Sequence, residues 1–279
     1  MQTVIVAIDN DMACPHVLRA AGALSAALGA RLIAVHVRDD GDRFRGDIER
    51  VVERDAGQAG VRLREFDGDV VDTLCRAASG PAVAAVATGT RRDMSGPHPT
   101  GSIAGQLITH LQIPVLCVPP DAKRSPRLQR ALVPIDGDPD TTSSLGRIVP
   151  TLRQYDVELT ALHIFDAEHA PPLEDHAPHE LEAWRESLLL ELDAFADKDV
   201  RLHLRSGWAP EHVVDVARET ETDVIVLPWK RRIHPPHAAV IRLVLSLSHV
   251  PVLLLDAQHR AAEHAVLQSR HEFELAVLP

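Results

Sequence analysis

The sequence predicts an α/β protein made of two tandem Rossmann-like domains, each a five-stranded parallel sheet with helices on both faces. Short apolar or β-branched runs alternate with Ala- and Leu-rich segments, which is typical of buried strands joined by helices. Four segments of the first half also recur in the second half, in the same order. A chain of 279 residues is long enough for two domains that each bury a core.

The repeat begins with "TVIVAIDND" at residues 3–11, which recurs as "RALVPIDGD" at residues 130–138 and sets Asp9 opposite Asp136. Three further pairs follow: "RLIAVHV" and "ELTALHI", "VRLREFDG" and "VRLHLRSG", "IPVLCV" and "VPVLLL". The spacing between the second and third pairs is longer in the second copy, so an insertion lies there. The chain is therefore interpreted as a tandem duplication.

Strands of the first copy are expected near residues 4–8, 31–37, 61–66, 82–87 and 114–118. The segment "CPHVLRAAGALSAALGA" between the first two strands predicts a helix, and its glycine near the end is a helix stop. In the insertion of the second copy, one apolar stripe predicts another helix. The stripe consists of Leu181, Trp184, Leu188, Leu192 and Phe195.

The duplication also predicts the domain boundaries. The N-terminal domain is expected to cover residues 1–120, a linker residues 121–128, and the C-terminal domain residues 129–256. Residues 257–279 are too few for a third domain, so a peripheral helix or a partly disordered extension is expected.

Charge and composition narrow the partners. The net charge is −11, and it arises after residue 127: 15 basic and 15 acidic residues precede that point, whereas 14 basic and 25 acidic residues follow it. An acidic field disfavours nucleic acid and anionic membrane surfaces as partners. No apolar run is long enough to span a bilayer, and the chain begins directly in a strand-like segment, so a cytoplasmic location is expected. The three cysteines lack the paired spacing of a metal site or disulfide framework.

The stretch "TGTRRDMSGPHPTGS", residues 88–102, follows an apolar run and precedes a helix-like one. Glycines at the start of a helix let backbone N–H groups approach a phosphate, so an anion site is one interpretation. An ordinary connection is another, since Gly and Pro also mark turns. A P-loop is disfavoured because Ser102 stands where that motif requires lysine.

The chain resembles a tandem universal stress protein, with each copy similar to one whole domain of that family. The resemblance is carried by the aspartates of "VAIDN" and "VPIDG", by "ALGARLIAVHV" and by "GSIAGQLITHLQIPVLCV". It implies the strand order 3-2-1-4-5, which sets the first and fourth strands side by side and brings Asp9 and the loop 88–102 to one crevice. It also implies an intrachain pseudo-dimer, with a homodimer as a further option through edge strands such as "PVLCV" and "PVLLL".

The nucleotide-binding branch of that family carries GxxG, nine residues, and then G(S/T). Gly89 fits the first glycine and Gly101–Ser102 the last pair, but Arg92 replaces the second glycine and the interval is one residue short. The resemblance implies that Asp9 contacts adenine, that the backbone of Val37 contacts the base, and that Gly89, Gly101 and Ser102 hold the phosphates. The expected ligand is ATP or another adenine nucleotide, with or without Mg. Arg92 obstructs close backbone approach, or its guanidinium contacts a phosphate itself.

Two observations limit the expected sites. Asp9 has an alternative role as a helix N-cap or as a crevice carboxylate without a ligand. In the second copy, Pro228 and Trp229 stand where Gly89 and Thr90 stand, and Ala238 and Ala239 replace the final Gly-Ser pair. A proline lacks the donor N–H, and a tryptophan fills space that a phosphate needs, so the second site is expected to be degenerate.

These features predict a cytoplasmic stress-response regulatory module that holds an adenine nucleotide in its N-terminal domain and signals to an unidentified protein partner. No catalytic or metal-binding residues are predicted, and at most slow ATP hydrolysis is expected, because no general base is evident. The alternative is an interaction module that binds no nucleotide and whose pockets are relics. An adenylate-transferring enzyme is disfavoured, since the chain has no SGGxDS or HxGH signature.

Overall fold

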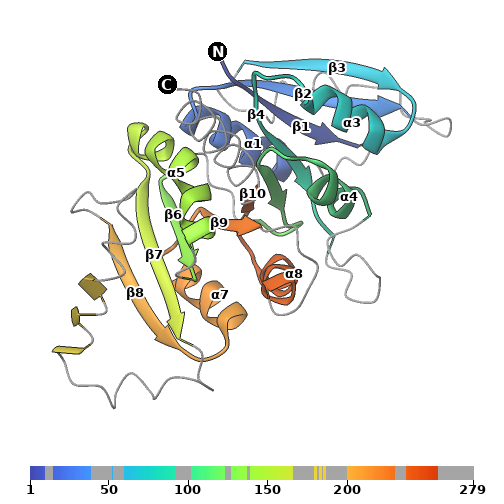
Figure 1. Cartoon of the computed structure of the whole chain (residues 1–279). Coiled ribbons are helices and arrows are strands. Elements are labelled where there is room, and N and C mark those ends of the chain that lie inside the picture. The colour runs from blue at the N-terminus through green and yellow to red at the C-terminus, as the bar shows by residue number, and fades with distance from the viewer. Residues whose placement is uncertain are drawn as a thin grey trace, which may run out of the picture.

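The fold comes from a computed structural model of the chain (Figure 1). The structure describes residues 1–9, 15–38, 52, 60–91, 102–122, 127–136, 139–165, 179–180, 182–183, 185–186, 200–229 and 237–256. The predicted helical stripe at 181–195 falls largely outside these residues, and the tail at 257–279 falls wholly outside them.

The first copy contains five parallel strands and the helices that join them. Its strands are β1 (Thr3–Ile8), β2 (Arg31–Arg38), β3 (Val61–Asp67), β4 (Val83–Gly89) and β5 (Val115–Val118). Its helices are α1 (Pro15–Ala27), α3 (Val70–Ala78) and α4 (Ser102–His110). All five strands were predicted, within one or two residues at most of their ends. Their order is β3-β2-β1-β4-β5, so the predicted order 3-2-1-4-5 is confirmed.

The second copy repeats this arrangement. Its strands are β6 (Arg130–Ile135), β7 (Glu158–Phe165), β8 (Arg201–Ser206), β9 (Val224–Trp229) and β10 (Val252–Asp256). Its helices are α5 (Pro139–Gln154), α7 (Ala209–Glu219) and α8 (His237–Leu247). The order β8-β7-β6-β9-β10 is again 3-2-1-4-5. The two copies share a detail at a helix end: Gly29 follows α1 with φ 55°, and Asp156 follows α5 with φ 59°.

The two five-stranded sheets join into one ten-stranded sheet. The last strands of the copies, β5 and β10, pair in antiparallel fashion, with Leu116 opposite Leu253, whereas the other described strand pairs are parallel. The edge strands that the sequence left free to pair within or between chains therefore pair within the chain. Beside this junction, Nδ1 of His249 lies 2.6 Å from a carboxylate oxygen of Asp121, which adds a polar contact between the copies.

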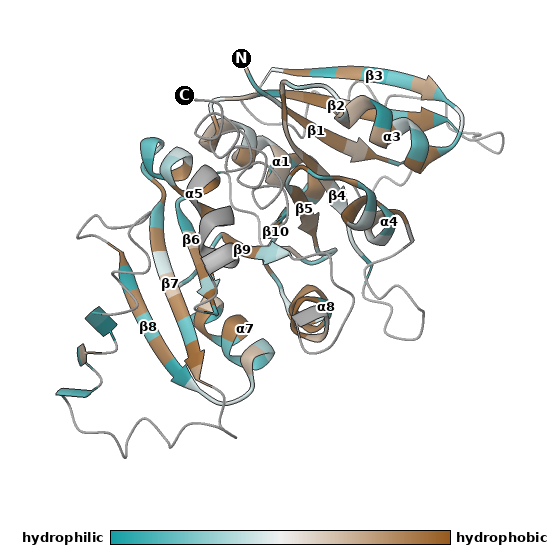
Figure 2. Ribbon diagram, in the orientation of Figure 1, coloured by the Kyte–Doolittle hydropathy of each residue, from teal (hydrophilic) through white to brown (hydrophobic). Residues whose placement is uncertain are grey.

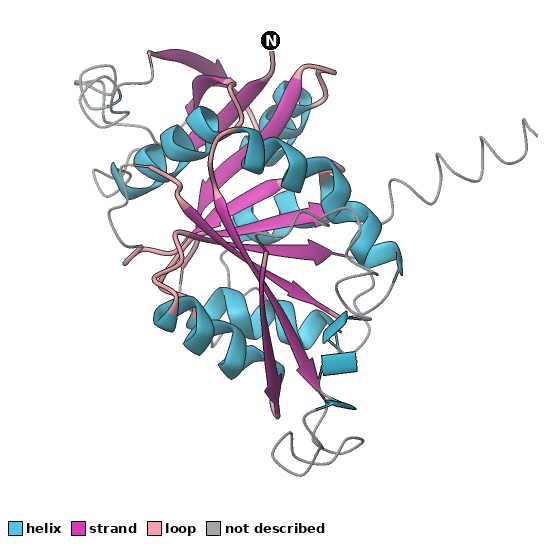
Figure 3. Cartoon of the chain, turned by 90° about the vertical axis from the view of Figure 1, so that its left-hand side faces the viewer, coloured by secondary structure: helices cyan, strands magenta, loops and turns pink. Residues whose placement is uncertain are grey.

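Two apolar cores fill the two faces of the sheet, and each core contains residues from both copies. One core contains α1 and α5, with buried side chains such as Leu24 and Leu152. The other contains α3, α4, α7 and α8, including Leu107 and Val244. Figure 3 shows helices on both sides of the twisted sheet. Long stretches of the strands are hydrophobic in Figure 2, as expected for strands that are covered on both faces.

Candidate functional site

The carboxyl ends of β1, β2 and β4 meet at one edge of the sheet. The register pairs Ile8 with His36 on β2 and Val6 with Ala87 on β4, so the chain leaves β1 and β4 at nearly the same level. Ligands of open parallel sheets bind at such an edge, beside the first strand, where successive crossovers depart in opposite directions. The strand order therefore forms a topological switch point between β1 and β4.

Three of the six predicted site residues lie at this edge. Asp9 follows β1 directly and is exposed. Val37 lies near the end of β2 and its side chain is buried, which leaves its backbone as the group that a ligand could contact. Gly89 is the last residue of β4 and is exposed. Arg92 and Gly101 fall outside the described residues, and Ser102 is described only as the first residue of α4.

Hydrogen bonds hold the end of β4 before the loop begins. The backbone N–H of Thr90 donates to the carbonyl of Val118 at 2.8 Å, and the Thr90 hydroxyl donates to the same carbonyl at 3.3 Å. A Cβ atom at Gly89 would lie 3.3 Å from a methyl carbon of Val17 on α1. The glycine thus lets α1 pack closely against the strand end, and it keeps this corner free of a side chain.

A buried histidine that the sequence analysis did not select also lies at this edge. His36 is 1% exposed, and its Nδ1 lies 3.3 Å from the carbonyl oxygen of Ile8. The second copy has the same contact: Nδ1 of His163 lies 3.1 Å from the carbonyl oxygen of Ile135. The signal was present in the repeat itself, because "RLIAVHV" and "ELTALHI" carry histidine at the same position.

The corresponding edge of the second copy has different side chains. Asp136 follows β6 and is exposed, as Asp9 is in the first copy. Pro228 and Trp229 end β9, and the indole Nε1 of Trp229 is buried without a hydrogen-bond partner in the described part of the chain. A bulky ring therefore occupies the strand end where the first copy has Thr90 beside an exposed glycine.

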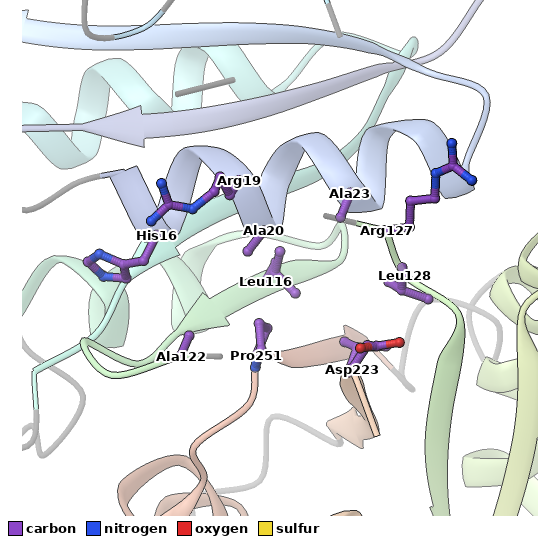
Figure 4. Close-up of a pocket in the computed structure, with 11 residues that line it drawn as sticks. His16, Arg19, Ala20, Ala23, Leu116, Ala122, Arg127, Leu128, Asp223 and Pro251 are labelled. Carbon is purple, nitrogen blue, oxygen red and sulfur yellow. The ribbon is translucent and has the colours of Figure 1, made fainter. Parts of the chain in front are cut away.

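A small pocket lies where the two copies meet, beside α1 (Figure 4). Its apolar lining includes Ala20, Ala23, Leu116, Leu128 and Pro251. His16 and Arg19 lie near one end of α1 and Arg127 near the other, so the basic groups do not converge. The Asp223 carboxylate already accepts hydrogen bonds from the backbone N–H groups of residues 129 and 130, at 2.9 and 3.0 Å. This pocket therefore belongs to the packing between the copies.

The helices of the described ranges include none that is long and apolar enough to cross a membrane. In the same ranges, no three His, Cys, Asp or Glu side chains gather in a way that could hold a metal ion.

Comparisons with known proteins agree with this architecture. The model of the Universal stress protein family matches residues 127–256. A functionally unknown protein from Pseudomonas aeruginosa PAO1 is 16% identical over 97% of this chain and 98% of that chain, with a TM-score of 0.67. A putative universal stress protein from Pseudomonas aeruginosa UCBPP-PA14 is 15% identical over 92% of this chain and 93% of that chain, with a TM-score of 0.64. These two likenesses show a shared fold over nearly the whole chain.

A third structure is that of a universal stress protein from Archaeoglobus fulgidus in complex with dAMP. It is 19% identical over 46% of this chain and 98% of that chain, with a TM-score of 0.36. The search of curated proteins found no similar sequence. The match to the Universal stress protein family model therefore covers the second copy, residues 127–256, and the N-terminal half repeats the strand order of that copy.

Proposed function

We propose that this protein is a regulatory module that binds ATP or another adenine nucleotide in its N-terminal copy, at the carboxyl ends of β1 and β4. The observation that carries the proposal is the parallel pairing of β1 with β4, because it brings the exits of both strands to one edge. Asp9 is exposed at one exit and Gly89 at the other. The loop between β4 and α4 then leads into the N-terminus of α4, which is a favourable end for an anion.

Each proposed site residue has a role that its chemistry allows. The Asp9 carboxylate accepts a hydrogen bond from the exocyclic amino group of adenine, and the backbone of Val37 contacts the base. Backbone N–H groups at Gly89, Gly101 and Ser102 hold the phosphates, where small side chains permit close approach. The guanidinium of Arg92 pairs with a phosphate oxygen. Mg accompanies the triphosphate in this proposal.

The second copy has no comparable site in this proposal. The end of β9 carries Pro228 and Trp229, and the excess negative charge of the chain follows residue 127. A proline supplies no backbone N–H for a phosphate, and an acidic field weakens the binding of an anion. We assign residues 1–120 to the nucleotide-binding domain, 121–128 to a linker and 129–256 to the second domain. In this proposal the protein is cytoplasmic, and the surface of its second domain binds a protein partner and so transmits the signal.

Titration calorimetry of the whole chain with ATP, with and without Mg, tests this proposal. Asp9→Ala is expected to weaken binding about tenfold, which corresponds to the loss of one polar contact. Gly101→Trp is expected to abolish binding, because its ring fills the phosphate loop. Asp136→Ala is the matched control, and its affinity for ATP is expected to equal that of the wild type.

The same titration decides between the proposal and its alternative. No heat from the wild type up to millimolar ATP would favour the alternative, an interaction module whose two crevices are relics. Binding that survives both Asp9→Ala and Gly101→Trp would move the nucleotide to another part of the chain.

A further inference from the structure

His36 on β2 is a buried polar residue that forms a hydrogen bond with the last residue of β1. Strand β2 is covered on both faces, and aliphatic side chains such as Val35 and Val37 fill the neighbouring positions. An imidazole in such a place loses its contact with water, which is unfavourable unless it forms a hydrogen bond. Nδ1 of His36 has this bond, at 3.3 Å from the carbonyl oxygen of Ile8.

The partner atom determines the direction of this hydrogen bond. A carbonyl oxygen only accepts, so Nδ1 of His36 must carry a proton and donate it. This hydrogen bond therefore selects the tautomer that carries a proton on Nδ1. Because Ile8 pairs with His36 in the strand register, the ring reaches the carbonyl of the residue directly beside it.

The same contact occurs in the second copy, although the surroundings differ. Nδ1 of His163 lies 3.1 Å from the carbonyl oxygen of Ile135, which again is the paired residue on the neighbouring strand. The His163 ring additionally packs edge-on against Phe165, with 4.7 Å between ring centroids. Both copies of the duplicated chain thus have this contact, although the residues that end β4 and β9 differ between them.

The bonded carbonyl belongs to the peptide unit that joins Ile8 to Asp9. A peptide unit is planar, so a hydrogen bond to the Ile8 carbonyl also fixes the N–H of Asp9 and the direction in which Asp9 leaves the sheet. We propose that His36 is a positioning residue that orients Asp9 toward the adenine of a bound nucleotide. This inference rests on the proposed function of the N-terminal copy. In the second copy, His163 orients Asp136 in the same way, but at an edge where we assign no nucleotide.

Three variants of the full chain separate positioning from general stabilisation. His36→Phe keeps a ring of similar size and removes the donor. His36→Asn restores a donor through its side-chain amide. His163→Phe is the matched control, because it removes the equivalent bond in the copy without a nucleotide.

Two measurements are made on each variant: the affinity for ATP by calorimetry, and the orientation of the Asp9 N–H by NMR residual dipolar couplings. We expect His36→Phe to rotate the Asp9 N–H and to weaken ATP binding about tenfold, with partial recovery in His36→Asn. His163→Phe is expected to leave both measurements at wild-type values. Long-range ¹H–¹⁵N correlation spectra of the imidazole rings in the wild type are expected to show that the proton of His36 is on Nδ1.

The outcomes distinguish this inference from the proposed function. An unchanged Asp9 N–H in His36→Phe, or equal losses of ATP affinity in His36→Phe and His163→Phe, would overturn the positioning role. If the wild type binds no nucleotide, the proposed function falls. In that case the orientation of the Asp9 N–H alone decides whether His36 positions Asp9.

Discussion

Cys117 lies in the middle of the sheet on β5, and its thiol is completely enclosed by apolar groups. Burial raises the pKa of this thiol to about 12, because a thiolate would lose its hydration. Cys75 on α3 is only partly buried, and its pKa is also raised, first by burial and then by the carboxylates of Asp72 and Asp69. Neither thiol has the lowered pKa of a reactive cysteine.

The raised pKa of Cys117 predicts a loss of stability at alkaline pH. The folded pKa is above the ordinary value of 9.0, so the contribution of the neutral thiol is complete below pH 9 and declines as the pH rises toward 12. The free energy of unfolding is therefore expected to fall more steeply above pH 9 in the wild type than in Cys117→Ala. Urea denaturation at several pH values measures both curves, and parallel curves would contradict the prediction.

Sequence reasoning found some site residues and missed another for a physical reason. Asp9 and Gly89 could be selected because an aspartate after a strand and a glycine before a loop are both recognised from residue type and position in the sequence. His36 was not selected, because its role depends on a hydrogen bond between neighbouring strands, and the alignment of β1 with β2 is a property of the folded sheet. The recurrence of histidine in the second copy was the available signal.

At the scale of single elements, α3 has a side-chain cap at its start, whereas Trp208 before α7 (Ala209–Glu219) forms no such hydrogen bond. Asp69 adopts an extended conformation before the helix, and its carboxylate accepts a hydrogen bond from the backbone N–H of Asp72 at 2.9 Å. Arg76 lies in the last turn, where a positive charge interacts favourably with the helix dipole. Both ends of α3 thus have side chains that stabilise the helix.

Asp69→Ala is expected to lower the free energy of unfolding by about 1 kcal/mol, because it removes the N-cap. Asp69→Asn keeps an acceptor oxygen at the same place and is expected to cost only a few tenths of that amount. Thermal denaturation followed by circular dichroism measures both changes. Equal losses in the two variants would show that charge, and not the cap, stabilises α3.

The strands could be predicted with their bounds because the apolar runs are short and bounded. Strand β4 extends two residues further than predicted, to Gly89, since pairing with β5 continues through Thr88 and Gly89. The periodicity of apolar residues does not predict how far two strands remain hydrogen-bonded to each other. The predicted helix in the insertion of the second copy stays a prediction, because most of its residues lie outside those that the structure describes.

At the scale of the whole molecule, the ends of α1 and α5 meet across the junction between the copies. Gly29 has φ 55°, and a Cβ atom placed there would lie 1.8 Å from the hydroxyl oxygen of Tyr155. Gly29→Ala is expected to lower the free energy of unfolding by about 1 to 2 kcal/mol, from backbone strain and from displacement of Tyr155.

Two comparisons separate these causes of the Gly29→Ala loss. Gly60→Ala is the control, because its Cβ position has no atom of another described residue within 4 Å, apart from its chain neighbours, and its φ is not in the left-handed region. The cost of Gly29→Ala is expected to be smaller in a Tyr155→Ala background. An equal cost in both backgrounds would assign the whole effect to the backbone. Chemical denaturation of the four variants and the wild type provides these values.

The shared cores predict that the two copies unfold together. All three tryptophans, at 184, 208 and 229, lie in the second half of the chain, so their fluorescence reports that half alone. Leu116→Ala changes a fully buried residue of the first copy that pairs with Leu253. It is expected to lower stability by about 2 to 5 kcal/mol and to shift the fluorescence and circular dichroism transitions equally. A fluorescence transition that stays at its wild-type midpoint would show independent copies.

The antiparallel pairing of β5 with β10 also determines in which direction the strands of each copy end. Because the strands within each copy are parallel, the exits of β1 and β4 lie at one rim of the sheet, and those of β6 and β9 lie at the opposite rim. A molecule bound beside Asp9 therefore cannot touch the groups beside Asp136. Pro228 and Trp229 at the end of β9 therefore do not touch the edge beside Asp9. The duplication thus gave the chain two groups of strand exits that point away from each other.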